Sequence, residues 1–374
     1  MIAITNTKIV LPDNLIWDGV VLLDGGLIAD FGERSDVSVP SGSKVIDAQG
    51  KYTAPGLVDI HAHGGGGYWF HKNPSEAAEF FLQNGTTTML ATMYNNLSLE
   101  QLLSGTQVLI DEIERGSIVK GIYMEGPYLN PKYGGDAKNS KYKGAIDKAQ
   151  YSRLIDAGRG YVKVWCLSPE LSGIDQFVQD AKAPGVIFAL AHSQALPEQI
   201  YRFLPHGLRL QTHHHNATAS ISTMLGVKGA GPDEAVMLCD DIYAKLIVDS
   251  RAVHVNEYNL RLALKTKGKD KIILISDSTE FGSDGQSDAP DLRFDDNGDL
   301  AGSALTVATA CQNMMKHTGA GICDVFKFGS LNPAKLLDLS SEIGSISKGK
   351  KANLVIVDDM INVSQVILDG VQKK

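Results

Sequence analysis

Short apolar runs recur along the middle of the chain and alternate with longer segments whose apolar residues repeat every three or four positions. The repeating segments predict helices, as at residues 256–265 and at 98–113, where Ser98 and Gln101 have the spacing of a capping box. The apolar runs predict eight strands, at residues 56–63, 86–91, 119–124, 162–167, 186–191, 208–212, 244–249 and 271–276.

This alternation predicts the fold class. It is typical of repeated βα units. Eight units in about 290 residues favour an α/β fold of the (β/α)8 TIM-like barrel type, which commonly has about 250 residues. A doubly wound open sheet is the alternative, but no Gly-x-Gly-x-x-Gly follows the first strand.

Both ends of the chain have a different pattern, with short strands joined by turn signals such as Asp24-Gly25-Gly26. The strands are expected at residues 2–10, 19–23, 27–31, 44–47, 352–357 and 363–368, with Val371 in a last one. We therefore expect a small β-sandwich domain formed by residues 1–52 and 344–374. The barrel would then occupy residues 53–343.

Composition and charge exclude several classes of protein. A net charge of -8 and a pI near 5.7 leave no basic excess to neutralise phosphates, which argues against a nucleic-acid binder. The chain has neither a polybasic block nor a run of about 18 apolar residues, so we expect no membrane partner. The first residues, Met1 to Asn6, lack the pattern of a signal peptide. Four scattered cysteines without CxxC spacing are expected as buried free thiols in a reducing cytoplasm.

Residues able to bind a metal follow five of the predicted strands. The first strand ends at His61 and His63, which share a face because residues two apart in a strand point the same way. The other four strands end in one such residue each: Glu125, His192, His213 and Asp277. A barrel enzyme carries its chemistry at these carboxyl ends. The five strand ends therefore predict one site.

The residue types indicate metal-assisted hydrolysis. A carboxylate and two neutral imidazoles supply three ligands and leave a position for water, as in catalytic zinc sites. A metal lowers the pKa of that water towards about 7, and an aspartate beside it can act as general base and then acid. Each residue also has an ordinary interpretation: Glu125 as a partner of a lysine, His192 as a hydrogen-bonded core histidine, Asp277 as a helix N-cap. His214 and His215 are expected in a loop or in support of the ligands.

Several motifs resemble the amidohydrolase superfamily and, more narrowly, the N-acetylglucosamine-6-phosphate deacetylase family. They are Pro55 to Gly64, Met124 to Asn130, Leu167 to Glu170, Ala191 to Ser193, Thr212-His213 with Asn216-Ala217, Ser276 to Ser278, Leu300 to Ser303, Asn332 to Ala334 and Gly344 to Asp358. The Glu-Gly-Pro segment at Glu125 is the most specific of them. Many other amidohydrolases use a carboxylated lysine on the fourth strand instead, and Lys163 lies too early for that role.

The resemblance implies a mechanism. Glu125, His192 and His213 would hold a metal, and His61 and His63 would be ligands of a second metal bridged to the first through Glu125. One or two divalent ions per chain are expected, zinc first, with iron, manganese and cobalt as alternatives. Water activated by the metal would attack the amide carbonyl of an N-acetylated amino-sugar 6-phosphate. Asp277 would take up a proton from that water and deliver one to the leaving amine.

The resemblance also implies substrate contacts and a partner. Asn216 and the backbone at Ala217 match positions near the sugar phosphate, and His254 matches a substrate-contacting histidine. The family is typically a homodimer whose neighbouring subunit supplies a basic residue to the phosphate.

The chain departs from the family pattern at three places. Where relatives often have His or Gln to polarise the carbonyl, this chain has Ala137, and Lys138 is the nearest replacement. Lys228 is the nearest counterpart of the partner-subunit arginine, and Arg251 in the strand-7 segment offers another anion contact. N-Acetylgalactosamine 6-phosphate or another small acylated amine is therefore an alternative substrate, and a non-catalytic binding barrel is a second alternative.

Overall fold

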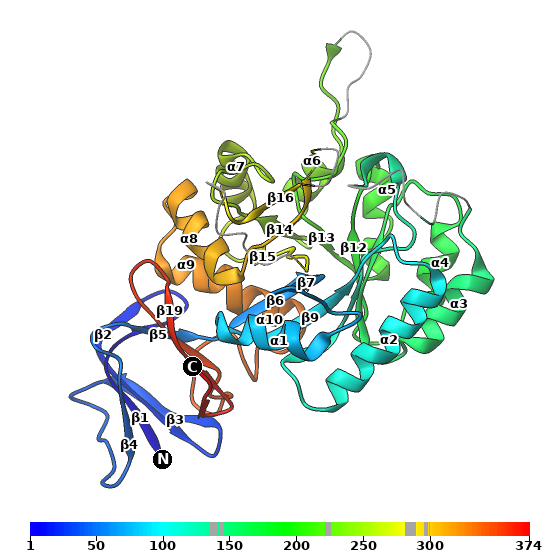
Figure 1. Ribbon diagram of the computed structural model, residues 1–374. Coiled ribbons are helices and arrows are strands. Elements are labelled where there is room, and N and C mark those ends of the chain that lie inside the picture. The colour runs from blue at the N-terminus through cyan, green and yellow to red at the C-terminus, as the bar shows by residue number, and fades with distance from the viewer. Residues whose placement is uncertain (135–140, 142–144, 221–225, 281–288, 295–297, 299) are drawn as a thin grey trace.

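The computed structural model describes residues 1–374 except 135–140, 142–144, 221–225, 281–288, 295–297 and 299. Its centre is a barrel of parallel strands that follow one another around the sheet in chain order (Figure 1). The strands are β6 (Leu57–Ala62), β9 (Thr86–Met93), β10 (Val119–Met124), β11 (Val162–Leu167), β12 (Ile187–Leu190), β13 (Leu208–Gln211), β14 (Tyr243–Ile247) and β15 (Ile272–Ile275). The end of the last strand returns to the end of the first through backbone hydrogen bonds. The Asp277 N–H donates to the His61 carbonyl (2.9 Å) and the His63 N–H to the Ser278 carbonyl (2.8 Å).

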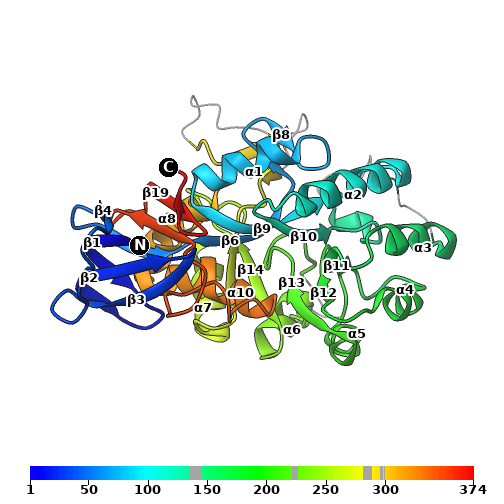
Figure 2. The ribbon, with the colours of Figure 1, turned by 90° about the horizontal axis from the view of Figure 1, so that it is seen from below.

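Helices surround the strands, as the view from below shows (Figure 2). They are α1 (Pro74–Gln83), α2 (Leu99–Glu114), α3 (Lys148–Ala157), α4 (Ile174–Ala181), α5 (Pro197–Tyr201), α6 (Pro232–Leu238), α7 (Glu257–Lys267), α8 (Val307–Thr318), α9 (Ile322–Phe326) and α10 (Asn332–Leu336). A π-helical turn, Lys327–Leu331, joins α9 to α10, and 3-10 turns occur at Pro131–Tyr133 and Leu204–His206. Two short hairpins, β7 (Gly64–Gly65) with β8 (Tyr68–Trp69) and β16 (Leu292–Phe294) with β17 (Leu300–Ser303), follow the first and last barrel strands.

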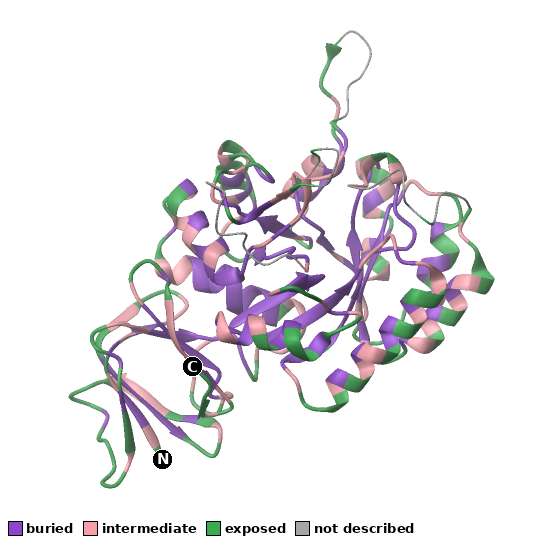
Figure 3. Cartoon of the chain, viewed as in Figure 1, coloured by how far each residue is buried: buried purple, intermediate pink, exposed green. Residues whose placement is uncertain are grey.

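Alternate residues of each barrel strand enter two different cores, and the barrel strands are accordingly buried along their length (Figure 3). In β14, Ala244 and Leu246 pack outward with the helices, whereas Ile247 packs inside the barrel with residues such as Val164 and Leu210. This period of two is expected for a strand covered on both faces. This alternation determines which residues point into the barrel interior at the end of each strand.

The terminal segments form one sheet beside the barrel, in the order β20-β19-β18-β5-β1-β2-β3, with β4 also paired to β1. Its strands are β1 (Ile2–Val10), β2 (Leu15–Asp24), β3 (Leu27–Glu33), β4 (Lys44–Asp47), β5 (Tyr52–Pro55), β18 (Leu354–Val357), β19 (Val363–Leu368) and β20 (Val371–Gln372). The sheet curls, since Leu27 of β3 bridges to Lys351 just before β18. Its two ends thereby enclose a shared core that includes Ile4, Ile28 and Ile356. The sandwich arises from one curled sheet that continues through β5 to Pro55.

The predicted fold is confirmed, and all eight expected barrel strands are present within a few residues of their predicted bounds. Ser98 caps α2, with the predicted capping box to Gln101. All four cysteines are free thiols; Cys166 and Cys311 are buried, while Cys239 and Cys323 are half-buried. Among the described residues, no helix is both long enough and apolar enough to cross a membrane.

A candidate metal centre at the mouth of the barrel

The six strand-end residues lie together at the carboxyl end of the barrel, and all are buried. Three of them have a left-handed backbone conformation: His192 (φ 42°), His213 (φ 33°) and Asp277 (φ 50°). Such φ values are uncommon for non-glycine residues and concentrate at functional sites. Here they occur within two residues of a strand end, where the chain leaves the extended conformation.

Glu125, His192 and His213 form the first of two groups. Oε1 of Glu125 lies 3.1 Å from Nε2 of His192 and 3.2 Å from Nε2 of His213, and the two Nε2 atoms are 3.2 Å apart. The Nδ1 atoms face backbone carbonyls, of Tyr133 at 2.8 Å and of Asn216 at 3.1 Å. Because a carbonyl only accepts, each neutral ring has its proton on Nδ1 and a free electron pair on Nε2. The electron pairs of the two Nε2 atoms and the carboxylate oxygen point to one place, and this set of ligands fits a divalent cation.

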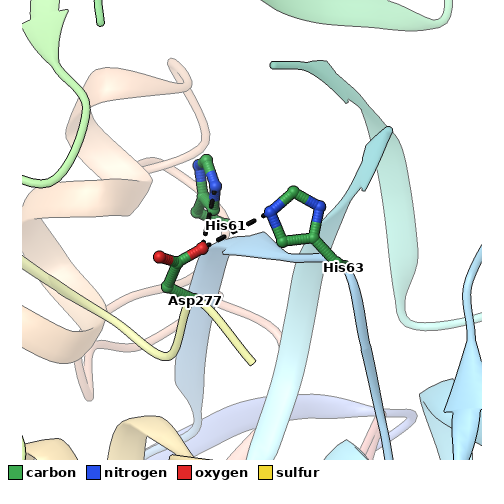
Figure 4. A group of neighbouring side chains, drawn as sticks. All are labelled: His61, His63 and Asp277. Atoms are coloured by element: carbon green, nitrogen blue, oxygen red, sulfur yellow. Dashed lines mark ion pairs between the residues drawn. The ribbon is translucent and has the colours of Figure 1, made fainter. Parts of the chain in front are cut away.

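His61, His63 and Asp277 form the second group (Figure 4), in which both histidines point from the end of the first barrel strand toward the aspartate. Oδ1 of Asp277 lies 3.2 Å from Nε2 of His61 and 3.4 Å from Nε2 of His63. Oε2 of Glu125 lies 3.1 Å from Nε2 of His63. Glu125 therefore lies between the two groups, with Oε1 near the first and Oε2 near His63.

The site keeps its carboxylates ionised. Burial alone would raise the pKa of Glu125, but His61, His192 and His213 hold it well below its usual range. Burial would also raise the pKa of Asp277, but His61 and His63 hold it well below its usual range. Asp277 thus carries the charge that a general base needs.

A lysine that sequence reasoning missed lies beneath this site. Lys245 of β14 is fully buried, and its Nζ lies 2.6 Å from Nδ1 of His61 and 4.1 Å from the centre of the Tyr123 ring. Burial lowers its pKa to about 8. The sequence contained the information to predict its position: Lys245 is two residues before Ile247 in the same strand, so both side chains point into the barrel.

A third group of potential ligands, His214, His215 and Asp233, lies next to the first. Nδ1 of His214 and Nδ1 of His215 are each 3.4 Å from an Asp233 oxygen. Asp233 also accepts from Gln211 (2.7 Å) and Thr218 (2.7 Å). This network holds the segment after β13 in place, and sequence reasoning did not identify Asp233 as part of it.

Three of the expected substrate contacts lie close to the metal ligands. Asn216 donates from its side-chain amide to the His254 carbonyl at 3.2 Å, and its own carbonyl accepts from His213. His254 is buried, with Nδ1 3.0 Å from Oδ2 of Asp249 and Nε2 3.0 Å from the Gly302 carbonyl. Ala217 follows with a left-handed φ of 55°. The structure therefore brings Asn216, Ala217 and His254 to one side of the first group.

The expected basic contacts are spread more widely. Arg251 is exposed on the segment after β14, near His254. Lys228 is exposed and pairs with Glu234 at 3.1 Å. Its segment belongs to the loop that projects from the barrel beside α6 (Figure 1). Ala137 and Lys138 lie outside the described residues. Lys163 is at the start of β11, and its Nζ donates to the Gly160 carbonyl (2.9 Å), consistent with its exclusion as a ligand.

Comparisons with known proteins agree with this geometry. Residues 52–373 match the Amidohydrolase family. An N-acetylglucosamine-6-phosphate deacetylase of Haemophilus influenzae is 26% identical, over 100% of this chain and 99% of its own. An N-acetylgalactosamine-6-phosphate deacetylase of Escherichia coli O157:H7 is 26% identical, over 87% of this chain and 89% of its own. The crystal structure of N-acetylglucosamine-6-phosphate deacetylase from Pasteurella multocida superposes with a TM-score of 0.87 at 26% identity and covers 99% of each chain.

Proposed function

Because the chain belongs to the amidohydrolase family, we propose that it removes the N-acetyl group from N-acetylglucosamine 6-phosphate, giving glucosamine 6-phosphate and acetate. The observation that carries this proposal is the convergence of the His192 and His213 Nε2 atoms on Glu125, in a site that also contains Asp277. Relatives named for this deacetylase activity match the whole length of the chain, which supports the choice of substrate class.

The residues divide the chemistry between them. Glu125, His192 and His213 would hold a divalent cation, whose chemistry when bound would be polarisation of the amide carbonyl and a pKa of water lowered towards about 7. Asp277 accepts a proton from the attacking water. It then returns that proton to the amine nitrogen as the carbon–nitrogen bond breaks. The buried position of Asp277 strengthens these charge interactions, because little water screens them.

Zinc is the metal we propose first, since two imidazoles and a carboxylate are typical of catalytic zinc. Iron, manganese and cobalt bind the same ligand types, so they are the alternatives for metal analysis.

The phosphate end of the substrate is proposed to lie over the segment after β13. Asn216 and the backbone at Ala217 would bind it, and His254 would contact the sugar. Arg251 and Lys228 would neutralise the phosphate, and Lys138 would act on the carbonyl side. Lys228 reaches the phosphate from a second subunit in this proposal, because its loop projects away from its own barrel.

We place the enzyme in the cytoplasm, where a sugar phosphate is available and four free thiols are stable. The barrel of residues 53–343 supplies the residues proposed to act. The segments 1–52 and 344–374 form an accessory domain.

The test is acetate release from N-acetylglucosamine 6-phosphate by metal-loaded protein. The control variants are Asp277→Asn in the site and Asp180→Asn on α4, whose carboxylate pairs with Tyr151 and Lys148. We expect turnover with the wild type and Asp180→Asn but not with Asp277→Asn. Equal rates in all three proteins would defeat the proposal.

N-Acetylgalactosamine 6-phosphate is the second candidate substrate, since the Escherichia coli relative carries that name at the same identity. Running both epimers side by side decides between them. A preference above about 100-fold for either one exceeds what a modest change in pocket shape supplies and would assign the substrate. Absence of turnover on a panel of acylated amines, with the metal bound, would favour a non-catalytic role.

A further inference from the structure

The histidines at the mouth of the barrel differ in what holds their Nδ1 atoms. His192 and His213 face backbone carbonyls there, so both are arranged to present Nε2 to a metal. His61 faces the Nζ of Lys245 at 2.6 Å instead. A ligand histidine needs an acceptor at its second nitrogen, and His61 has a lysine.

The Nζ of Lys245 makes the contacts of an ammonium group. The side chain is fully buried in the barrel interior, and its Nζ lies 4.1 Å from the centre of the Tyr123 ring, in cation–π geometry. Burial lowers the pKa of Lys245, and the carboxylates of Glu125, Asp277 and Asp59 oppose that effect. A buried ammonium is retained in a protein when such partners compensate for its lost hydration.

The protonation of His61 follows from this contact. An ammonium has three donors and no acceptor, so Nδ1 of His61 must accept. The proton of the neutral ring is then on Nε2. That atom faces two carboxylates, with Oδ1 of Asp277 at 3.2 Å and Oε1 of Glu125 at 3.7 Å. In this form His61 has no electron pair to give a metal, and it provides a donor beside Asp277.

We propose that Lys245 is a positioning residue that takes the place of a second metal ion. The enzyme then binds a single ion, at Glu125, His192 and His213, and Lys245 fixes His61 with its Nε2 beside Oδ1 of Asp277, at 3.2 Å. This inference rests on the proposed function for the role of Asp277, but its claim about metal number is independent of any substrate. A second divalent ion at His61 and His63 would need the electron pair on Nε2 and would lie close to a buried positive charge.

Counting metal ions tests the proposal directly. Wild-type protein, Lys245→Met and the double variant Lys245→Met/His61→Gln are saturated with zinc, freed of excess by gel filtration and analysed by mass spectrometry. Methionine has a similar length, carries no charge and offers only a weak acceptor to Nδ1–H. We expect about one zinc in the wild type, about two in Lys245→Met and about one again in the double variant.

Lys163→Met is the matched control, because it removes a half-buried lysine of another barrel strand, β11, whose Nζ donates to the Gly160 carbonyl away from the site. It should leave the count at that of the wild type. Two ions in the wild type, or a single ion in a folded Lys245→Met, would overturn the proposal.

A measurement on the wild type keeps the test open if Lys245→Met does not fold. Nitrogen-15 NMR of the zinc-loaded protein, with the His61 signals assigned by their loss in His61→Gln, locates the ring proton. We expect a directly bonded proton on Nε2 and none on Nδ1. A metal-bound Nε2 with the proton on Nδ1 contradicts the proposal.

Failure of the proposed function and failure of the proposed role of Lys245 give different results. If the metal count and the His61 proton are as expected but no amino-sugar phosphate is hydrolysed, the proposed function is wrong and the role of Lys245 in excluding a second ion stands. If the wild type is active and binds two ions, the proposed function stands and the role of Lys245 in excluding a second ion is wrong.

Discussion

The Nε2 atoms of His192 and His213 face each other at 3.2 Å, and in their neutral forms neither ring has a proton to place between them. Their protons are on Nδ1, where the carbonyls of Tyr133 and Asn216 hold them. The Glu125 oxygen brings further negative charge to the same point. Electron pairs held this close repel one another, so the folded site gains stability when a cation lies among them.

Metal should therefore stabilise the folded protein, and Glu125→Gln should remove most of that effect. At a free zinc concentration about 100 times the Kd, binding contributes about 2.7 kcal/mol. We expect the melting temperature of the wild type to fall by several degrees in EDTA and to recover with zinc. Glu125→Gln should show little difference between the two conditions, with zinc content measured in parallel.

Glu112→Gln is the control for that experiment. Glu112 is also a buried glutamate, but it lies on α2 and accepts from Ser75 at 2.6 Å, away from the site. Its variant should keep the zinc-dependent shift. A full zinc response in Glu125→Gln would show that the ion binds elsewhere, for instance at His214, His215 and Asp233.

Replacing Asp277 should separate catalysis from metal binding. In Asp277→Asn the side chain keeps its shape but loses the charge that accepts a proton. General acid–base groups contribute about 10²–10⁴ in rate, so we expect kcat to fall by that factor while the zinc content stays at the wild-type value. A variant within tenfold of the wild type would mean that another group transfers the proton.

The strand ends were predictable because hydrophobicity alone defined the strands. Met124 and Ile275 close apolar runs, and Glu125 and Asp277, one and two residues further on, could only lie at the mouth of the barrel. In a parallel barrel every strand ends at the same face, so residues distant in sequence meet without any long-range information.

Other features depend on contacts that a linear pattern does not contain. The left-handed φ of His192 and His213 is set by the chain's turn after each strand. The partner of Lys245 is determined by how strands β6 and β14 face each other across the interior. Asp233 lies in the first turn of α6, far from the strand end that it supports.

Arg251 gives a prediction about the phosphate. The residue is exposed beside His254, and a guanidinium binds phosphate through two parallel hydrogen bonds. Charge-assisted contacts of this kind are worth about 1.5–3 kcal/mol, or about 10- to 150-fold. We expect Arg251→Ala to raise KM for the sugar phosphate by that factor and to leave the rate on unphosphorylated N-acetylglucosamine unchanged.

Arg159→Ala is the matched control, since Arg159 is an exposed arginine that pairs with Asp156 at 2.6 Å. Steady-state kinetics on both sugars distinguishes the outcomes. Equal losses on the phosphorylated and unphosphorylated substrates would assign Arg251 to the fold of its loop and not to the phosphate.

Asp249 organises the loop that carries Arg251 and His254. Its carboxylate accepts from the backbone N–H groups of Arg251 (2.9 Å), Val253 (3.0 Å) and His254 (2.8 Å), and from the His254 ring. Burial alone would raise the pKa of Asp249, but the His254 ring and these N–H groups lower it below its ordinary value. The folded state therefore favours the ionised form more than the unfolded chain does.

The sign of the pH dependence follows. The stabilisation from Asp249 is fully present above its unfolded pKa of about 3.9 and is lost as the pH falls through the lower folded value. Asp249→Asn should reduce the free energy of unfolding by about 1–3 kcal/mol at neutral pH. The gap between variant and wild type in the free energy of unfolding should be the same at pH 7 and pH 5, and it should narrow only below about pH 4.

Urea unfolding of the metal-free protein measures that gap without interference from the titration of zinc ligands. Asp156→Asn, an exposed aspartate on α3, should stay within about 0.5 kcal/mol of the wild type throughout. If the gap already narrows between pH 7 and pH 5, the folded pKa of Asp249 lies above its unfolded value. The loop would then be held by the shape of the carboxyl group and not by its charge.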